Sequence, residues 1–258
     1  MFIDSHCHLD WDEFADDRET VLARAQKLGV EKFLTISIRV REFDRVLRVA
    51  EQFDQVFCAV GTHPHFAHEE PDVTTEELVA LSRHRKVVAI GESGLDSFLC
   101  KTPLEDQRRA FANHIAAARQ AQLPLVIHSV RVDEEMSETL VSETRKGAFP
   151  IIMHCFSGGT KLAETCLSLG AYISFSGILC WEEEDELRSL AATIPDDRIL
   201  LETDAPSLSP IPKIQSRNEP ALITHVAETL ARVRGQNVNA VAALTSENFR
   251  RVCRKAFS

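Results

Sequence analysis

Short apolar runs alternate with longer amphipathic segments along most of this chain. The runs are nearly continuous in apolar residues, which is typical of parallel strands that are buried on both faces. They cover Met1 to Asp4, Lys32 to Ile38, Val56 to Val60, Val87 to Gly91, Leu125 to His128, Ile151 to His154, Tyr172 to Phe175 and Ile199 to Glu202. Segments with helical spacing lie between the runs, among them Glu19 to Leu28, Glu42 to Phe53, Thr75 to His84 and Leu104 to Gln122.

Eight such strand and helix units in 258 residues predict an α/β fold, a TIM (β/α)8 barrel that occupies residues 1–258 as one domain. A doubly wound sheet fits less well, because it would carry a glycine-rich turn after the first strand. This chain has Ser5-His6-Cys7-His8 there instead. The stretch from Ala205 to Ser216 contains three prolines and is predicted to be a long loop after the last strand.

Side chains that can bind metal ions occur at the ends of these runs. His6 and His8 follow the first run, and an extended chain points both imidazoles to the same side. The later residues of this kind, in chain order, are His63, His65, Glu92, His128, His154 and Asp204. Because the active sites of such barrels lie at the carboxyl ends of the strands, these groups are expected to converge.

A lone histidine at a strand end is more often a hydrogen-bonded structural residue than a ligand. A set of four imidazoles and two carboxylates in register is a much stronger signal, and it predicts a site for two divalent cations. The predicted ligands are His6, His8, Glu92, His128, His154 and Asp204. Imidazole nitrogens suit Zn, Mn, Fe or Co, whereas the carboxylates extend the choice towards Mn or Mg. His63 and His65 are not needed to complete this set.

Composition narrows the class of protein. A hydrophobic content of 44% and a charged content of 26% are typical of a globular protein, and they argue against a disordered or fibrous chain. The formal net charge of -10 argues against non-specific binding of nucleic acid by the whole surface, although a local anion-binding patch beside metal ions is compatible with it.

The seven cysteines are odd in number and form no Cys-x-x-Cys pair, so neither a disulfide framework nor a cysteine zinc site is expected. We find no signal-peptide pattern and no stretch long enough to cross a membrane, which together with the cysteine usage favours a cytoplasmic location.

Seven short motifs occur in order along the chain. They are Asp4-Ser5-His6-Cys7-His8-Leu9-Asp10, Gly61-Thr62-His63-Pro64-His65, Gly91-Glu92-Ser93-Gly94-Leu95-Asp96, Leu123-Pro124-Leu125-Val126-Ile127-His128-Ser129, His154-Cys155-Phe156-Ser157-Gly158, Glu202-Thr203-Asp204-Ala205-Pro206 and Arg217-Asn218-Glu219-Pro220. Together they resemble the TatD family of metal-dependent deoxyribonucleases, and they span essentially the whole chain.

This resemblance implies a barrel of the amidohydrolase, metal-dependent hydrolase type that carries two metals. His6, His8, Glu92 and Asp204 would hold the first metal. Glu92, His128 and His154 would hold the second, so that Glu92 bridges the two, and one shared carboxylate commonly holds two cations about 3.5 to 4 Å apart. No candidate for a carbamylated lysine occurs at the fourth strand, which argues against the dihydroorotase and phosphotriesterase branches of this architecture.

The sequence departs from the common family pattern at three positions of the expected substrate face. Ser97-Phe98 stands where many members carry two aromatic residues, Val130 precedes Arg131, and Ser207 replaces a bulky residue. These departures leave the substrate preference open.

The predicted reaction is hydrolysis of a phosphodiester, with DNA or another phosphodiester as the substrate. Water activated at the two-metal centre would attack phosphorus and Asp204 would accept the proton. His63 and His65 are predicted to bind a phosphate oxygen or to protonate the leaving group. No obligate protein partner is implied, and a monomer is expected.

Two alternatives stay open. The same centre could hydrolyse a small ester, amide or phosphoester, which a closed apolar pocket would favour. A groove with Lys101, Arg131 or Lys213 near the metals would instead favour nucleic acid. The second alternative is a metal-binding scaffold without turnover, against which the complete ligand set counts.

Overall fold

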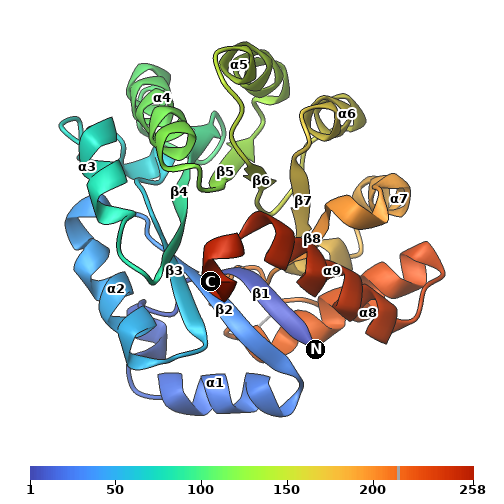
Figure 1. Cartoon of the computed structure of the whole chain (residues 1–258). Coiled ribbons are helices and arrows are strands. Elements are labelled where there is room, and N and C mark those ends of the chain that lie inside the picture. Colours follow the sequence, from blue (N-terminus) through green and yellow to red (C-terminus); the bar gives the residue numbers. More distant parts are fainter. Residues whose placement is uncertain (214–215) are drawn as a thin grey trace.

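Parallel strands form the centre of the molecule, and helices surround them (Figure 1). The computed structural model describes residues 1–213 and 216–258. Within these residues the strands are β1 (Phe2–Cys7), β2 (Val30–Ile36), β3 (Val56–Val60), β4 (Val87–Asp96), β5 (Leu125–Val130), β6 (Ile151–Met153), β7 (Tyr172–Phe175) and β8 (Ile199–Leu201). The α-helices are α1 (Arg18–Lys27), α2 (Phe43–Gln52), α3 (Thr75–Leu81), α4 (Leu104–Ala121), α5 (Asp133–Arg145), α6 (Thr160–Ser168), α7 (Asp185–Thr193), α8 (Ile223–Arg234) and α9 (Val238–Val252).

The sheet closes on itself between its first and last strands. The eight described strands pair in sequence order, from β1 to β8. At the seam, Cys7 forms a parallel bridge with Ala205, and the amide of His8 donates to the carbonyl of Ala205 over 2.8 Å. The amide of Asp204 donates to the carbonyl of His6 over 2.9 Å. The predicted TIM barrel is therefore confirmed, and the seam itself holds three of the predicted metal ligands.

Three strands extend further than their apolar runs indicate. His6 lies within β1, Glu92 within β4 and His128 within β5, whereas the sequence placed each at or just beyond a strand end. The β4–β5 ladder continues through the pair Gly94 and His128, because a glycine without a Cβ permits the close approach of the two strands. A Cβ on Gly94 would lie 1.9 Å from the carbonyl oxygen of His128.

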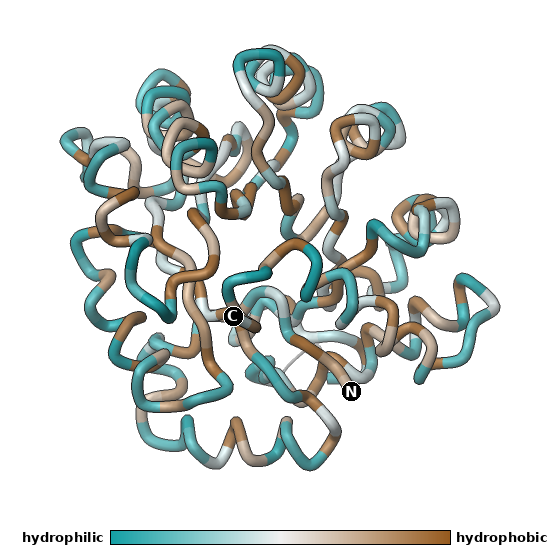
Figure 2. The backbone as a smooth tube through the Cα atoms, in the orientation of Figure 1, coloured by the Kyte–Doolittle hydropathy of each residue, from teal (hydrophilic) through white to brown (hydrophobic). Residues whose placement is uncertain are grey.

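The inside of the barrel is filled by alternate strand residues and is closed at one end by α9. Side chains such as Ile3, Leu34 and Val126 form one buried cluster with Phe249 and Val252 of α9. Figure 2 shows the strands as mainly hydrophobic and the outer helices as mixed, as expected of helices with one face in water. Because α9 covers the amino ends of the strands, a cavity that opens from the barrel into solvent has to lie at their carboxyl ends.

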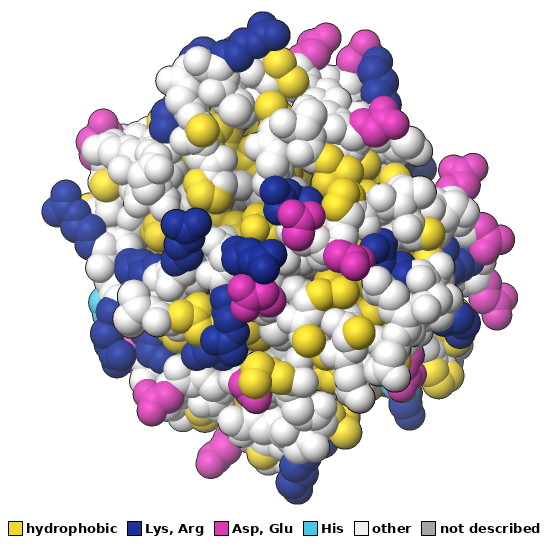
Figure 3. All heavy atoms as spheres, turned by 45° about the vertical axis from the view of Figure 1, so that its right-hand side comes forward, with side chains coloured by type: hydrophobic (Ala, Val, Ile, Leu, Met, Phe, Trp, Pro, Cys, Tyr) yellow, Lys and Arg dark blue, Asp and Glu magenta, His cyan; other side chains and the backbone are white. Residues whose placement is uncertain are grey.

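Basic side chains also gather at the end that α9 covers. Figure 3 shows Lys and Arg side chains grouped on part of the face drawn, with acidic side chains among them. Here the Lys86 ammonium group donates to the carbonyls of Phe53, Asp54 and Val56. The Lys255 ammonium group donates to carbonyls that follow α3. These two cations therefore stabilise backbone carbonyls at the end opposite the predicted metal ligands.

Three further expectations concern the cysteines, membrane-spanning helices and the loop after the last strand. All seven cysteines are free thiols, in agreement with the absence of a disulfide framework. None of the helices in the described part of the chain is long and apolar enough to cross a membrane. The predicted loop from Ala205 to Ser216 is only partly assessed, since residues 214–215 lie outside the described residues.

Candidate metal centre

The first predicted group of ligands meets at the barrel seam. His6 and His8 come from β1 and its end, and Asp204 follows β8. The Nε2 atoms of His6 and His8 each lie 3.4 Å from Oδ1 of Asp204. Nε2 of His6 also lies 3.3 Å from Oε2 of Glu92 on β4. The strand alternation expected of His6 and His8 thus places both imidazoles against one carboxylate.

The second predicted group surrounds the other oxygen of Glu92. Oε1 of Glu92 lies 2.9 Å from Nδ1 of His128 and 3.1 Å from Nε2 of His154. It also lies 3.4 Å from Nε2 of His63. One carboxylate oxygen of Glu92 therefore faces the first group and the other faces the second, which is the arrangement required of a bridging ligand.

The donor set fits divalent cations. His6 is fully buried, and neither of its ring nitrogens has a hydrogen-bond partner among the described residues. A buried polar group without a partner is costly, and a cation between His6 and its neighbouring carboxylates would remove that cost. Two atoms that each lie about 2.0 to 2.2 Å from one tetrahedral cation are about 3.3 to 3.6 Å apart. The separations of 3.3 and 3.4 Å around His6 match this spacing.

The imidazoles of the centre stabilise the ionised forms of Glu92 and Asp204. Burial alone would raise the pKa of the Glu92 carboxyl, but its interactions with the imidazoles of His154, His63 and His6 outweigh it and hold that pKa well below its usual range. Burial likewise opposes ionisation of Asp204, yet its hydrogen bond with His8 and the charge of His154 keep its pKa lowered. Both carboxylates are therefore ionised at neutral pH, the state in which they bind cations.

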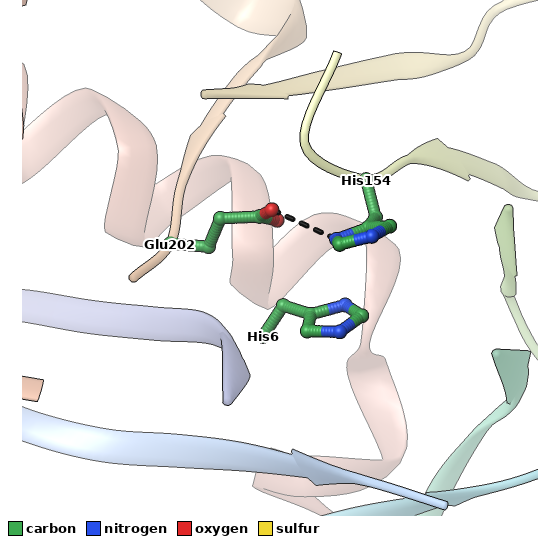
Figure 4. A group of neighbouring side chains, drawn as sticks. All are labelled: His6, His154 and Glu202. Atoms are coloured by element: carbon green, nitrogen blue, oxygen red, sulfur yellow. Dashed lines mark hydrogen bonds and ion pairs between the residues drawn. The ribbon is translucent and has the colours of Figure 1, made fainter. Parts of the chain in front are cut away.

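The buried carboxylate of Glu202 supports His154, one of the predicted ligands, on the side away from Glu92. Oε1 of Glu202 lies 2.9 Å from Nδ1 of His154 (Figure 4). The same oxygen accepts the amide of Cys155 over 2.7 Å. The rings of His154 and His6 stack with their centroids 3.7 Å apart. Such contacts fix the ring orientation and leave Nε2 of His154 facing Glu92. Glu202 is therefore a positioning residue for His154.

Asp4 stabilises the barrel seam through hydrogen bonds with Thr203. Its carboxyl oxygens accept the hydroxyl of Thr203 over 2.6 Å and the amide of Thr203 over 2.9 Å. Burial raises the pKa of Asp4 to about 8, with the Thr203 hydrogen bonds acting against that rise. These contacts tie the strand that carries His6 to the segment that carries Asp204.

Asp96 is a further candidate for a functional residue. It belongs to one of the seven motifs, but the sequence predicted no role for it. It is buried, and its Oδ2 lies 3.0 Å from Nε2 of His65 and 3.3 Å from Nε2 of His128. The available signal was its spacing, since Asp96 lies four residues after Glu92 and an even spacing in a strand places both side chains on one face.

His63 and His65 both line the cavity, but they face different partners. His63 precedes the 3-10 turn Pro64–Phe66 and His65 lies within it, and Nδ1 of His63 accepts the amide of His65 over 3.1 Å. His63 then turns Nε2 towards Glu92, whereas His65 faces Asp96. His63 is thus as close to Glu92 as the predicted ligand His6, whereas His65 is set back from the Glu92 carboxylate.

All of the predicted ligands except the fully buried His6 line a cavity of about 980 Å³, which is the size of a small-molecule site. Its described lining includes Trp11, Phe98, Trp181 and Leu208 beside the polar centre. Among those lining residues Arg131 is the one lysine or arginine, and neither Lys101 nor Lys213 is part of the lining. The cavity therefore combines an anionic and imidazole-rich centre with apolar walls and a single permanent positive charge.

His114 is a buried histidine outside the metal centre that supports the loop carrying His63. Its Nε2 accepts the amide of Thr62 over 2.9 Å, and its Nδ1 lies 2.7 Å from the carbonyl of Ala110. This bonding requires the neutral ring. Burial lowers the pKa of His114 to about 4.

Because the pKa of His114 is depressed in the folded state, its contribution to stability is complete above the unfolded value of about 6.5 and is lost as the pH falls towards 4. We expect about 2 kcal/mol of this contribution to disappear between pH 7 and pH 5. Urea unfolding at both pH values should show a smaller pH effect in a His114→Gln variant than in the unmodified protein. Equal pH effects in the two proteins would contradict this assignment.

A parallel barrel with clustered imidazoles and carboxylates at its carboxyl end defines a metal-dependent hydrolase. The family model described as TatD related DNase matches residues 3–254, and the chain belongs to this family. It is 35% identical over 257 residues to "Uncharacterized metal-dependent hydrolase YabD" of Bacillus subtilis, covering 98% of this chain and 99% of the relative. It is also 35% identical over 243 residues to "3'-5' ssDNA/RNA exonuclease TatD" of Salmonella typhimurium, covering 92% and 93% of the two chains.

Solved structures agree with this assignment. The crystal structure of YJJV, a TatD homologue from Escherichia coli, superposes with a TM-score of 0.91 at 31% identity, covering 98% of both chains. An organophosphorus hydrolase from Deinococcus radiodurans superposes with a TM-score of 0.69 at 16% identity, covering 98% of this chain and 92% of the other. The second match shows a shared barrel fold.

Proposed function

We propose that this TatD-type hydrolase is a nuclease that hydrolyses phosphodiester bonds at the ends of DNA. The observation that carries the proposal is the position of Glu92, whose two oxygens face two groups of imidazoles at the bottom of an open cavity. The exonuclease name of the Salmonella typhimurium relative supports a nucleic-acid substrate. We further propose that residues 1–258 act as one catalytic domain and as a monomer.

Two divalent cations per chain are part of the proposal. His6, His8, Glu92 and Asp204 would hold one, and Glu92, His128 and His154 would hold the other. Zn, Mn and Mg are the candidates, because the donor set mixes imidazole and carboxylate. When bound, such a pair supplies activated water and neutralises charge on the phosphoryl oxygens.

Asp204 is proposed to accept the proton that the attacking water loses. Its pKa is lowered, so the carboxylate is ionised at neutral pH and is able to accept. Its Oδ1 is held between His6 and His8, and its backbone amide is held by the His6 carbonyl. The base is therefore fixed in position before substrate binds.

His63 and His65 are proposed to bind a phosphate oxygen or to protonate the leaving group. Burial lowers the pKa of His63 to about 4, so its ring is neutral at pH 7. Since Nδ1 of His63 accepts the His65 amide, the ring carries its hydrogen on Nε2, the atom that faces Glu92. His63 can therefore donate a hydrogen bond from Nε2 into the centre. His65 is half-buried, lines the cavity and is anchored by Asp96.

The experiment that tests this function compares substrates on one preparation of the protein. We expect protein reloaded with Mg, Mn or Zn to release nucleotides from a single-stranded DNA oligonucleotide. We expect much slower turnover of small carboxylic esters, amides and phosphomonoesters. Turnover of one of these small substrates without nucleotide release would replace the nuclease proposal by the small-substrate alternative. Stoichiometric metal binding without turnover of any substrate would support a non-catalytic scaffold.

A His65→Gln variant tests the role of His65 separately from metal binding, because it leaves all six proposed ligands in place. We expect unchanged metal content and a fall in nucleotide release of about 100-fold, the usual scale for losing a positioned acid or donor. Unchanged release would remove His65 from the mechanism without affecting the metal assignment.

A further inference from the structure

Two large apolar side chains are exposed where the cavity meets solvent. Phe98 is 54% exposed and Leu99 is 66% exposed, and both line the cavity. The other large apolar residues that are exposed in the described chain, Met1 and Leu28, do not line it. Exposed apolar surface that gathers at a binding cavity marks a contact for a ligand with an apolar face.

Arg131 covers one face of the Phe98 ring. The centre of its guanidinium lies 3.7 Å from the ring centroid, which is a cation–π contact. The Ser97 hydroxyl donates to the carbonyl of Arg131 over 2.7 Å, which ties the end of β4 to the end of β5. The phenyl ring is thus supported from one side while much of its surface stays open.

Asp96 connects this ring to the metal centre. Its Oδ1 accepts the amides of Phe98 and Leu99 over 2.8 and 2.9 Å, while its Oδ2 faces His65 and His128. Gln107 of α4 holds the backbone of Asp96 on both its amide and its carbonyl. A single buried carboxylate therefore sets the position of the exposed ring relative to the proposed catalytic side chains.

We propose that Phe98, backed by Arg131, is a stacking platform for the base of the 3'-terminal nucleotide, which is the end that a 3'-5' exonuclease cleaves. This inference rests on the proposed nuclease function. Every base has a flat π face, so stacking binds all four with little sequence preference. Glu184 and Asp133 also line the cavity, and Arg131 is the one permanent cation in its described lining. Because one permanent cation is available to bind phosphate groups, we expect stacking on the base to supply much of the affinity for DNA.

The test uses a single-stranded oligonucleotide with 2-aminopurine as its 3'-terminal base. We expect a Phe98→Ala variant to raise KM for this substrate about 5- to 150-fold, the range for one lost stacking contact, with little change in kcat. Phe98→Trp should keep KM low. Leu28→Ala is the matched control, since it removes an equally exposed apolar side chain outside the cavity.

Two further measurements separate stacking from a structural effect. Binding to a turnover-deficient Asp204→Asn variant should quench the 2-aminopurine fluorescence, and adding Phe98→Ala should remove the quenching. An oligonucleotide whose terminal residue lacks a base should show the same KM with the unmodified protein and with the Phe98→Ala variant. Quenching that moves to a 5'-terminal 2-aminopurine would place the platform at the other end and overturn the stated assignment.

The outcomes distinguish this proposal from the one on which it rests. If the unmodified protein releases no nucleotides with any metal, the nuclease function fails and the platform fails with it. If the unmodified protein releases nucleotides but Phe98→Ala leaves KM and quenching unchanged, the nuclease function stands and the platform alone is overturned.

Discussion

Replacing Asp204 with Asn is expected to lower nucleotide release at least 1000-fold while the protein stays folded. Loss of a general base alone costs about 100- to 10,000-fold, and Asp204 is also a proposed metal ligand. The amide of Asn has almost the same shape as the carboxylate, so the hydrogen bond from its backbone amide to the His6 carbonyl is retained. The measurement is the single-turnover rate of nucleotide release at saturating metal.

Glu184→Gln is the matched control for this variant. Glu184 also lines the cavity, but among the described residues it forms no ion pair with an imidazole, whereas Oδ1 of Asp204 lies 3.4 Å from Nε2 of both His6 and His8. We expect its release rate to stay within a few-fold of the unmodified protein. If Asp204→Asn keeps more than a tenth of the rate at full metal occupancy, Asp204 is not the base.

Removal of bound metal is expected to abolish activity and to lower Tm by about 10 °C or more. Two cations that are each present at 100 times their Kd stabilise the folded state by about 5 kcal/mol together, and 1 kcal/mol corresponds to about 2 to 4 °C in a chain of this size. The physical reason is that the buried imidazole of His6 and the buried carboxylates of Glu92 and Asp204 lose the partner that offsets their burial.

Elemental analysis and thermal unfolding of the same samples test this expectation. We expect two ions per chain in the reloaded protein and fewer in Glu92→Gln, because Glu92 faces both groups of ligands. Glu135→Gln, a charge change on the surface of α5, should keep both ions. A single ion per chain, or the same Tm with and without metal, would contradict the two-metal site.

Much of the architecture was readable before the structure. The ranges Val56 to Val60 and Tyr172 to Phe175 coincide with β3 and β7, because a buried parallel strand needs an apolar residue at nearly every position. The ends of β4 and β5 were missed for a different reason. Glycine and polar residues interrupt the apolar run there, while the pairing between neighbouring strands continues.

Some features of the candidate site were likewise predictable from the sequence, and others were not. Strand alternation and the rule that strand ends meet at one face predicted that His6, His8 and Asp204 lie near one another, and their side chains are 3.4 Å apart in the structure. The role of Asp96 was not readable, because it depends on His65 and on the turn containing Phe98, which lie in different parts of the sequence. The cation–π contact between Arg131 and Phe98 was equally invisible along the chain.

The sequence by itself determined the barrel, the TatD family and the identity of the candidate ligands, since these follow from local apolar patterns and from residue types in a fixed order. Only the tertiary structure decided which oxygen of Glu92 faces which imidazoles, and that one Asp96 carboxylate joins the exposed Phe98 to the metal centre. The physical reason is that strand order and periodicity specify which face a side chain occupies. Distances of about 3 Å between atoms from different strands depend on how the whole barrel closes.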